Sequence, residues 1–195
     1  EKDASIEMMA AQGLEPVMLR LIAYFPGEPR ARAMRLVRAG DESDLAVLAF
    51  QDADGTGAPL GAPGLRLAGA PPAPGSEVIV LGYPTGLRAL LAQTGPAFVR
   101  KLQADNALDF WGVAARLAEA GYIAPLASRG IVGQATLATI VYDAETTHGG
   151  SGGPVLNAAG EVVAVNMAIL PEYGGSNLGV PAALLTALLG EGPSN

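Results

Sequence analysis

Glycine and proline interrupt the apolar stretches of this chain at short intervals. The 195 residues include 26 glycines and 15 prolines, and both residue types favour turns over helix interiors. Short apolar stretches rich in valine, isoleucine and leucine then predict strands joined by tight turns. The predicted strands span residues 16–25, 30–38, 44–50, 77–84, 130–133, 138–142, 155–156 and 161–170. The pattern therefore predicts a mostly β protein, built as a barrel or a sandwich.

A connection rich in glycine and proline divides the chain into two halves. Residues 52–75 hold six glycines and five prolines and show little periodicity, which is typical of an irregular link. We therefore expect one unit over residues 1–74, which includes the link, and a second over residues 75–195. The apolar strand at residues 44–50 opens with Asp44, and we expect it to be buried on both faces.

Two segments carry a helical pattern instead. Apolar residues recur at helical spacing over residues 105–120, where Asp105 or Asn106 would cap the helix and Gly121 would end it. A short final helix is expected over residues 181–189, because proline suits a first helical turn and glycine follows the last one.

Two aromatic residues of the first helix, Phe110 and Trp111, could be interpreted as a platform for a ligand. Aromatic residues at helical spacing usually belong to a core. We therefore expect them to be buried and assign them no catalytic role.

Charge and composition exclude several classes of function. The chain has 19 acidic and 12 basic residues and a formal net charge of −7, whereas binding to a nucleic-acid backbone needs a clustered basic surface. There is no cysteine, so disulfides, thiol nucleophiles and zinc–thiolate sites are excluded. His148 is the only histidine, and we expect neither a metal nor a cofactor. No apolar run of the sequence is long enough to span a membrane.

The segment Thr146-Thr-His-Gly-Gly-Ser-Gly-Gly-Pro154 places one serine among four glycines. Glycine lets the backbone turn tightly and direct successive N–H groups into one concavity, as the stabilisation of an oxyanion requires. Ser151 is therefore a candidate nucleophile, although a flexible glycine-rich turn would look the same in isolation.

The same serine also matches the Gly-x-Ser-x-Gly elbow of α/β-hydrolases, because Gly149 and Gly153 flank it. That elbow is followed by a helix and by a histidine later in the chain. Here a Pro-Val-Leu-Asn strand and turn follow, and no histidine lies beyond His148. We therefore reject this interpretation.

Four motifs together resemble the trypsin-like serine proteases, and specifically the bacterial HtrA (Deg) type. The resemblance covers most of residues 16–189, and the motifs occur in the order of that family. They are Ser43-Asp-Leu-Ala-Val-Leu48, Gly75-Ser-Glu-Val-Ile-Val-Leu-Gly-Tyr-Pro-Thr-Gly86, Tyr142-Asp-Ala144 with Gly149-Gly-Ser-Gly-Gly-Pro154, and Gly160-Glu-Val-Val-Ala-Val-Asn-Met-Ala-Ile169.

This resemblance implies a fold of two β-barrels, with an incomplete first barrel at the N-terminus and a short C-terminal helix. Residues 87–129 are longer and more helical than the family has between the corresponding strands, so we expect a helical insertion there. The first barrel should be open or paired with another segment, because exposed strand edges invite partners.

The resemblance also implies a role for each residue of a peptidase site. Ser151 would be the nucleophile, Asp44 would orient the general base, and the N–H groups of Gly149 and Ser151 would form the oxyanion hole. The residues implied to bind the substrate backbone or line the first specificity pocket are Asn166, Met167, Ala168, Ile169, Glu145 and His148. The substrate would be a peptide or an unfolded protein, oligomers are conceivable, and an extracytoplasmic location follows from the resemblance alone.

The general base is the point at which the sequence departs from the family. The catalytic histidine of the family precedes the aspartate, and Glu1 aligns just past that position. The histidine could lie upstream of Glu1, for example on an N-terminal companion fragment, in which case this chain alone would be inactive. His148, three residues before Ser151, could replace it. Alternatively, the domain could bind peptides or protein partners without cleaving them.

Overall fold

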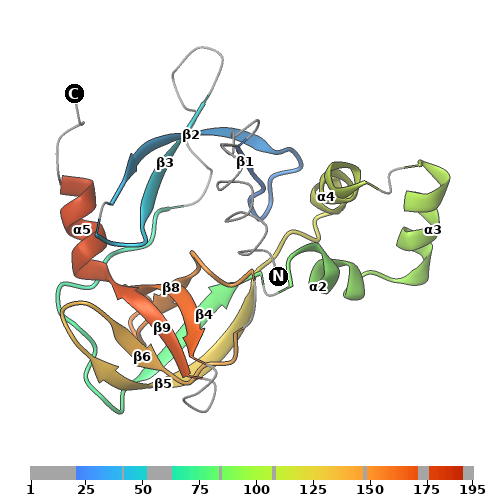
Figure 1. The fold of residues 1–195 in the computed structure, drawn as a ribbon. Coiled ribbons are helices and arrows are strands. Elements are labelled where there is room, and N and C mark those ends of the chain that lie inside the picture. Colours follow the sequence, from blue (N-terminus) through green and yellow to red (C-terminus); the bar gives the residue numbers. More distant parts are fainter. Residues whose placement is uncertain are drawn as a thin grey trace, which may run out of the picture.

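The computed structural model describes residues 21–40, 42–51, 63–83, 85–106, 109–146, 149–170 and 176–190. Within them, a three-stranded sheet precedes a closed barrel, three helices are inserted between the first two strands of that barrel, and a C-terminal helix ends the described chain (Figure 1). The strands are β1 (Ile22–Ala23), β2 (Arg32–Ala39), β3 (Ala46–Phe50), β4 (Glu77–Gly82), β5 (Leu126–Ala135), β6 (Ile140–Tyr142), β7 (Pro154–Leu156), β8 (Val162–Leu170) and β9 (Ser176–Pro181). The helices are α2 (Leu87–Ala92), α3 (Pro96–Ala104), α4 (Phe110–Glu119) and α5 (Ala182–Gly190). The prediction of a mostly β protein is confirmed.

The second half forms a closed antiparallel barrel in the order β4-β5-β6-β9-β8-β7. Side chains alternate along β4, where Val78 and Val80 are buried while Glu77 and Ile79 are exposed. This period of two is the reason that the strand can line a core on one side only. The core of the barrel consists of Val78, Val80, Val132, Ile140, Tyr142, Ala144, Val155, Val163 and Ala164.

The first half has an open sheet in the order β1-β2-β3 within the described residues, which agrees with an incomplete first barrel. The expectation that the strand around residues 46–50 is buried on both faces is wrong. Leu48 of β3 lies opposite Leu36 of β2, and these side chains are 42% and 50% exposed. An apolar strand is buried on both faces only when a second layer covers each face.

An apolar cluster joins the two halves. Leu45, just before β3, packs with Val180 of β9 and Leu188 of α5, and Val47, Val165, Met167, Leu184 and Leu185 surround them. Arg38 of β2 adds a hydrogen bond from its guanidinium to the carbonyl oxygen of Leu188. Helix α5 therefore holds the start of β3 against β8 and β9.

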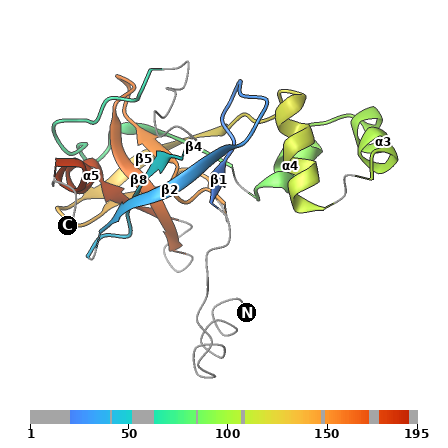
Figure 2. The same ribbon diagram turned by 90° about the horizontal axis from the view of Figure 1, so that it is seen from above.

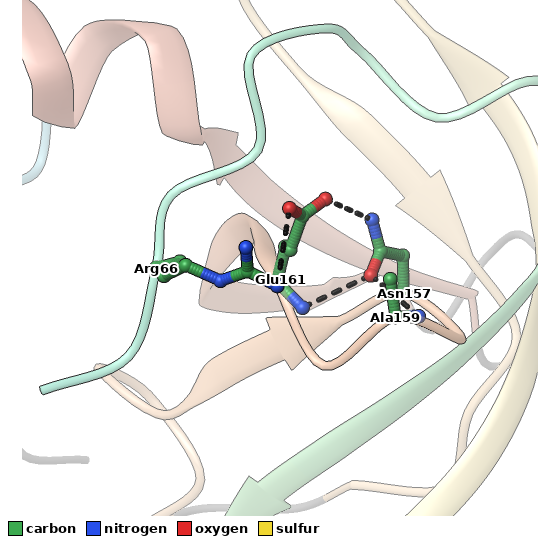
Figure 3. A network of polar contacts seen from close by, with 4 residues as sticks. All are labelled: Arg66, Asn157, Ala159 and Glu161. Atoms are coloured by element: carbon green, nitrogen blue, oxygen red, sulfur yellow. Dashed lines mark hydrogen bonds and ion pairs between the residues drawn. The ribbon is translucent and has the colours of Figure 1, made fainter. Parts of the chain in front are cut away.

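The connection between the halves is bound to the second barrel near the β7–β8 turn (Figure 3). Asn157 Oδ1 accepts hydrogen bonds from the N–H groups of Ala159 and Glu161, at 3.0 and 2.9 Å. The Glu161 carboxylate lies 3.7 Å from the Arg66 guanidinium, and the Val162 N–H donates to the Arg66 carbonyl oxygen at 2.8 Å. The side chain of Asn157 thus shapes the turn against which the connection lies.

The three helices α2, α3 and α4 form an arm that projects from one side of the molecule (Figures 1 and 2). Leu90, Leu102, Val113, Leu117, Ala118 and Ile123 form its core. β5 begins at Leu126, so the last four residues of the expected insertion at 87–129 belong to the barrel. None of the helices in the described ranges is long and apolar enough to cross a membrane.

The predicted boundaries and burial of the helix at residues 105–120 were partly wrong. The helix begins at Phe110, because the Asp109 side chain accepts hydrogen bonds from the N–H groups of Trp111 and Gly112. It ends where predicted, before Gly121, whose φ is 75°. Phe110 and Trp111 are 61% and 43% exposed rather than buried, because they lie at the end of the helix that the core of the arm does not reach.

Candidate active site

The serine loop lies between β6 and β7 and is fixed to β8 by three hydrogen bonds. Ser151 is exposed, and its hydroxyl donates to the carbonyl oxygen of Met167 at 2.9 Å. The Gly152 N–H donates to the Asn166 carbonyl oxygen at 2.7 Å, and the Asn166 N–H donates to the Gly153 carbonyl oxygen at 2.8 Å. A short loop held in this way presents its serine side chain in a defined position.

Two glycines of this loop are required by its geometry. Gly149 has a φ of 94°, and a Cβ there would lie 2.6 Å from the Tyr83 carbonyl oxygen. A Cβ at Gly153 would lie 2.1 Å from the Leu81 carbonyl oxygen. Both neighbouring atoms belong to the backbone at the end of β4, so no side chain can move away to make room.

Among the described residues, three N–H groups of the loop, those of Gly149, Gly150 and Ser151, donate no backbone hydrogen bond. Two of them, Gly149 and Ser151, are the predicted oxyanion donors. Gly149 also lies against the Tyr83–Gly86 turn, where the helical arm begins. The turn that leads into the arm therefore lies next to Gly149, one of the two predicted oxyanion donors.

Four of the six predicted substrate-binding residues, Asn166 to Ile169, lie on β8, beyond the end of its pairing with β7. That pairing extends to Val165, which lies opposite Pro154. Met167 lies at a shift in the β8–β9 register, and from Ala168 to Leu170 β8 pairs with β9 on one edge. No described strand pairs with the other edge of β8 from Met167 onwards. A free strand edge beside a serine can pair with the backbone of an extended peptide.

Asp44 is exposed and lies in the turn between β2 and β3. Its neighbour Leu45 packs in the same apolar cluster as Met167, whose carbonyl oxygen accepts the hydrogen bond from Ser151. The fold therefore brings the Asp44 turn and the serine loop to the junction of the two halves. No described hydrogen bond joins Asp44 to Ser151.

Glu145 and His148 are the two remaining predicted residues. Glu145 is exposed and lies between the end of β6 and the loop. His148 lies outside the described residues, as do the side chains of Ala168 and Ile169. Within the described ranges, no group of three or more His, Asp or Glu side chains could hold a metal ion.

A buried polar group beside the loop was not predicted from the sequence. The Tyr142 hydroxyl donates to Asn166 Oδ1, and the Asn177 side-chain amide donates to the Ala144 carbonyl oxygen. Burial raises the pKa of the Tyr142 hydroxyl far above its ordinary value. The only signal in the sequence is that Asn166 interrupts an apolar strand, where an asparagine needs a hydrogen-bonding partner.

Comparisons with known proteins agree with the fold. Residues 20–165 match the family model of the trypsin-like peptidase domain. The fold resembles the serine endoprotease from Yersinia pestis, with 19% identity, a TM-score of 0.60, and coverage of 91% of this chain and 50% of that one. It also resembles the active form of the Rv3671c protease from M. tuberculosis, with 18% identity, a TM-score of 0.56, and coverage of 85% and 61%. The chain thus spans less than two thirds of either protein. A search of curated protein sequences found no match.

Proposed function

Because the chain belongs to the family of trypsin-like peptidase domains, we propose that it is a serine endopeptidase whose nucleophile is Ser151. The observation that carries the proposal is the serine loop, which is bound to β8 with the Ser151 hydroxyl 2.9 Å from the Met167 carbonyl oxygen. The motifs described above further favour the HtrA type. The division of the chain into two units at residue 75 remains a prediction.

The proposed reaction is acyl transfer followed by hydrolysis. Ser151 Oγ bonds to the carbonyl carbon of the peptide while a histidine removes its proton, and the N–H groups of Gly149 and Ser151 stabilise the negative oxygen that forms. The histidine then protonates the leaving amine as the peptide bond breaks. Water attacks the acyl-enzyme with help from the same base, which releases the acid and restores Ser151.

Substrate would bind as an added strand. Of the expected stretch from Asn166 to Ile169, the backbone of Asn166 is already bound to Gly152 and Gly153. The edge of β8 from Met167 to Ile169 would therefore pair with the peptide backbone beside Ser151. Glu145 and His148 would lie at the rim of the pocket for the residue that precedes the cleaved bond. The proposed substrate is therefore a peptide or an unfolded protein segment.

The base is proposed to lie on a segment upstream of Glu1, with Asp44 as the residue that orients it. This proposal rests on the position of Asp44 at the junction of the two halves, where its turn adjoins the β8 strand that carries Met167. The alternative is a domain that binds peptides without cleaving them. That alternative is favoured by a single observation, namely that His148 is the only histidine in the sequence.

The test is labelling of the purified chain with a fluorophosphonate, read by intact mass and peptide mapping, with and without a partner segment that contains the upstream histidine. We expect an adduct on Ser151 that is lost in Ser151→Ala. Ser76→Ala is the matched control, because the exposed Ser76 hydroxyl also donates to a backbone carbonyl oxygen, that of Ala73.

Labelling that persists in Ser151→Ala would remove Ser151 from the mechanism. Absence of labelling and of peptide cleavage with the histidine segment present would favour the peptide-binding alternative, which predicts saturable binding of extended peptides without turnover.

A further inference from the structure

The buried polar side chains of the barrel gather beside the serine loop. Among the described residues, the buried polar or charged side chains are Asn166 and Asn177, which are 3% and 0% exposed. The hydroxyl of the buried Tyr142 joins them, and the other buried side chains in this part of the chain are apolar. Buried amides do not make a barrel core more stable than apolar side chains would. The location of both asparagines beside the serine loop therefore requires an explanation.

Tyr142, Asn177 and Asn166 lie on three neighbouring strands, β6, β9 and β8. Tyr142 is paired with Asn177, and Asn166 is paired with Gly179. A Cβ at Gly179 would lie 3.2 Å from Tyr142 Cε1 and 2.9 Å from Ala164 Cβ. The absence of a side chain at Gly179 therefore lets the Tyr142 ring cross β9 and reach the Asn166 amide on β8.

The hydrogen bonds of this group hold both ends of the serine segment. At the start of the segment, the Asn177 side-chain amide donates to the Ala144 carbonyl oxygen. At the end of the segment, the backbone of Asn166 is hydrogen-bonded to Gly152 and Gly153. The Asn166 side chain accepts a hydrogen bond from the Tyr142 hydroxyl. The residues between these two points include Gly149 and Ser151.

From this geometry we infer that Tyr142, Asn166 and Asn177 are positioning residues, which hold Ala144 and the stretch from Gly149 to Gly153 in the positions that the reaction needs. The inference rests on the proposed function, because the position of Ser151 matters for a reaction only if Ser151 is the nucleophile. Asn177 Oδ1 is buried and has no hydrogen-bond partner among the described residues, which is a cost in stability that an apolar side chain would avoid. The Asn177 amide is thus explained by the Ala144 carbonyl oxygen that it binds rather than by packing.

The first experiment is amide hydrogen exchange on Tyr142→Phe, which keeps the ring and removes the hydroxyl. Asn166 Oδ1 then loses its donor, so we expect the Gly152 amide to exchange about 10-fold faster, while the amides of β4 and β5 change less than about 2-fold. Tyr122→Phe is the matched control, since it removes a hydroxyl in the helical arm, away from the serine loop.

A purely structural role would give a different result. Exchange that rises by the same factor throughout the barrel, or that stays unchanged at Gly152, would overturn the inference. If Tyr142→Phe does not fold, Asn177→Leu decides the question, because it removes the donor to Ala144 at similar volume. For that variant, faster exchange confined to residues 144–153 is the supporting result, and unchanged exchange there is the contrary one.

Labelling of Ser151 by the fluorophosphonate is the second readout. We expect the labelling rate to fall about 10-fold in Tyr142→Phe and to stay unchanged in Tyr122→Phe. An unlabelled wild-type chain, tested with the histidine segment present, would contradict the proposed function. The exchange result would still decide whether the polar group holds the segment.

Discussion

Substitution of Gly149 by alanine tests whether the serine loop needs the space behind it. The Cβ that alanine adds would lie 2.6 Å from the Tyr83 carbonyl oxygen and 3.2 Å from the Gly86 nitrogen. Both atoms belong to the turn between β4 and α2, where the Gly86 N–H donates to the Tyr83 carbonyl oxygen at 2.9 Å. To accept a methyl group, either this turn or the serine loop must move.

The expected loss of unfolding free energy has two parts. Alanine at a φ of 94° costs about 1–2 kcal/mol, because Cβ crowds the backbone in this region. The contact with Tyr83 adds about 1–3 kcal/mol, the usual cost of overpacking a site that cannot relax. The total is about 2–5 kcal/mol.

Gly152→Ala is the matched control. Gly152 lies in the same loop with a φ of 85°, but a Cβ there would have no neighbour within 4 Å. Alanine at this position should therefore cost only the conformational part, about 1–2 kcal/mol. The difference between the two variants isolates the contact with the β4–α2 turn.

The assay is equilibrium unfolding in urea, together with the rate of fluorophosphonate labelling of Ser151. We expect Gly149→Ala to be less stable than Gly152→Ala by about 1–3 kcal/mol and to be labelled more slowly. Equal losses of stability in the two variants would show that the turn does not support the loop, and the reasoning would be refuted.

Three further predictions concern the arm, the barrel interior and the connection. Leu117→Ala, at a fully buried site in the arm, should lower the free energy of unfolding by about 2–5 kcal/mol. Amide hydrogen exchange should become faster in the arm and stay unchanged in the barrel. Burial raises the pKa of the Tyr142 hydroxyl, so this proton is lost at a lower pH in the unfolded chain than in the folded one. The contribution of the protonated hydroxyl to the free energy of unfolding is therefore complete below about pH 10. Above that pH it falls by up to about 1.4 kcal/mol per pH unit. Unfolding at pH 9 and pH 11 should show a smaller fall in Tyr142→Phe. Asn157→Ala should destabilise the barrel by about 1–3 kcal/mol, whereas Arg66→Ala, at an exposed ion pair, should cost less than about 1 kcal/mol in the same unfolding assay.

Much of the fold could be predicted because strands and turns are encoded locally. The runs at β4, β6, β7 and β8 are apolar and bounded by turn residues, so their local pattern is sufficient. β9 was not predicted, because Ser176, Asn177, Gly179 and Pro181 are turn formers. It is a strand because β6 and β8 supply backbone partners on both of its edges.

The helical arm shows a similar limit. The periodicity predicted a helix that ends before Gly121, but the choice of cap was decided by Asp109, whose side chain binds two N–H groups. The exposure of Phe110 and Trp111 depends on where the core of the arm ends, and no local pattern encodes that position.

The sequence by itself determined the short strands and the glycine loop around Ser151, because each depends on residues close together in the chain. It also determined the membership of the peptidase family, because short motifs occur in the order of that family. Only the tertiary structure decided which residues support that loop. Asn166 follows Tyr142 by 24 positions, and Asn177 follows Ala144 by 33. Their contacts depend on the register in which the barrel closes, and this register results from the packing of all six strands together rather than from any single segment.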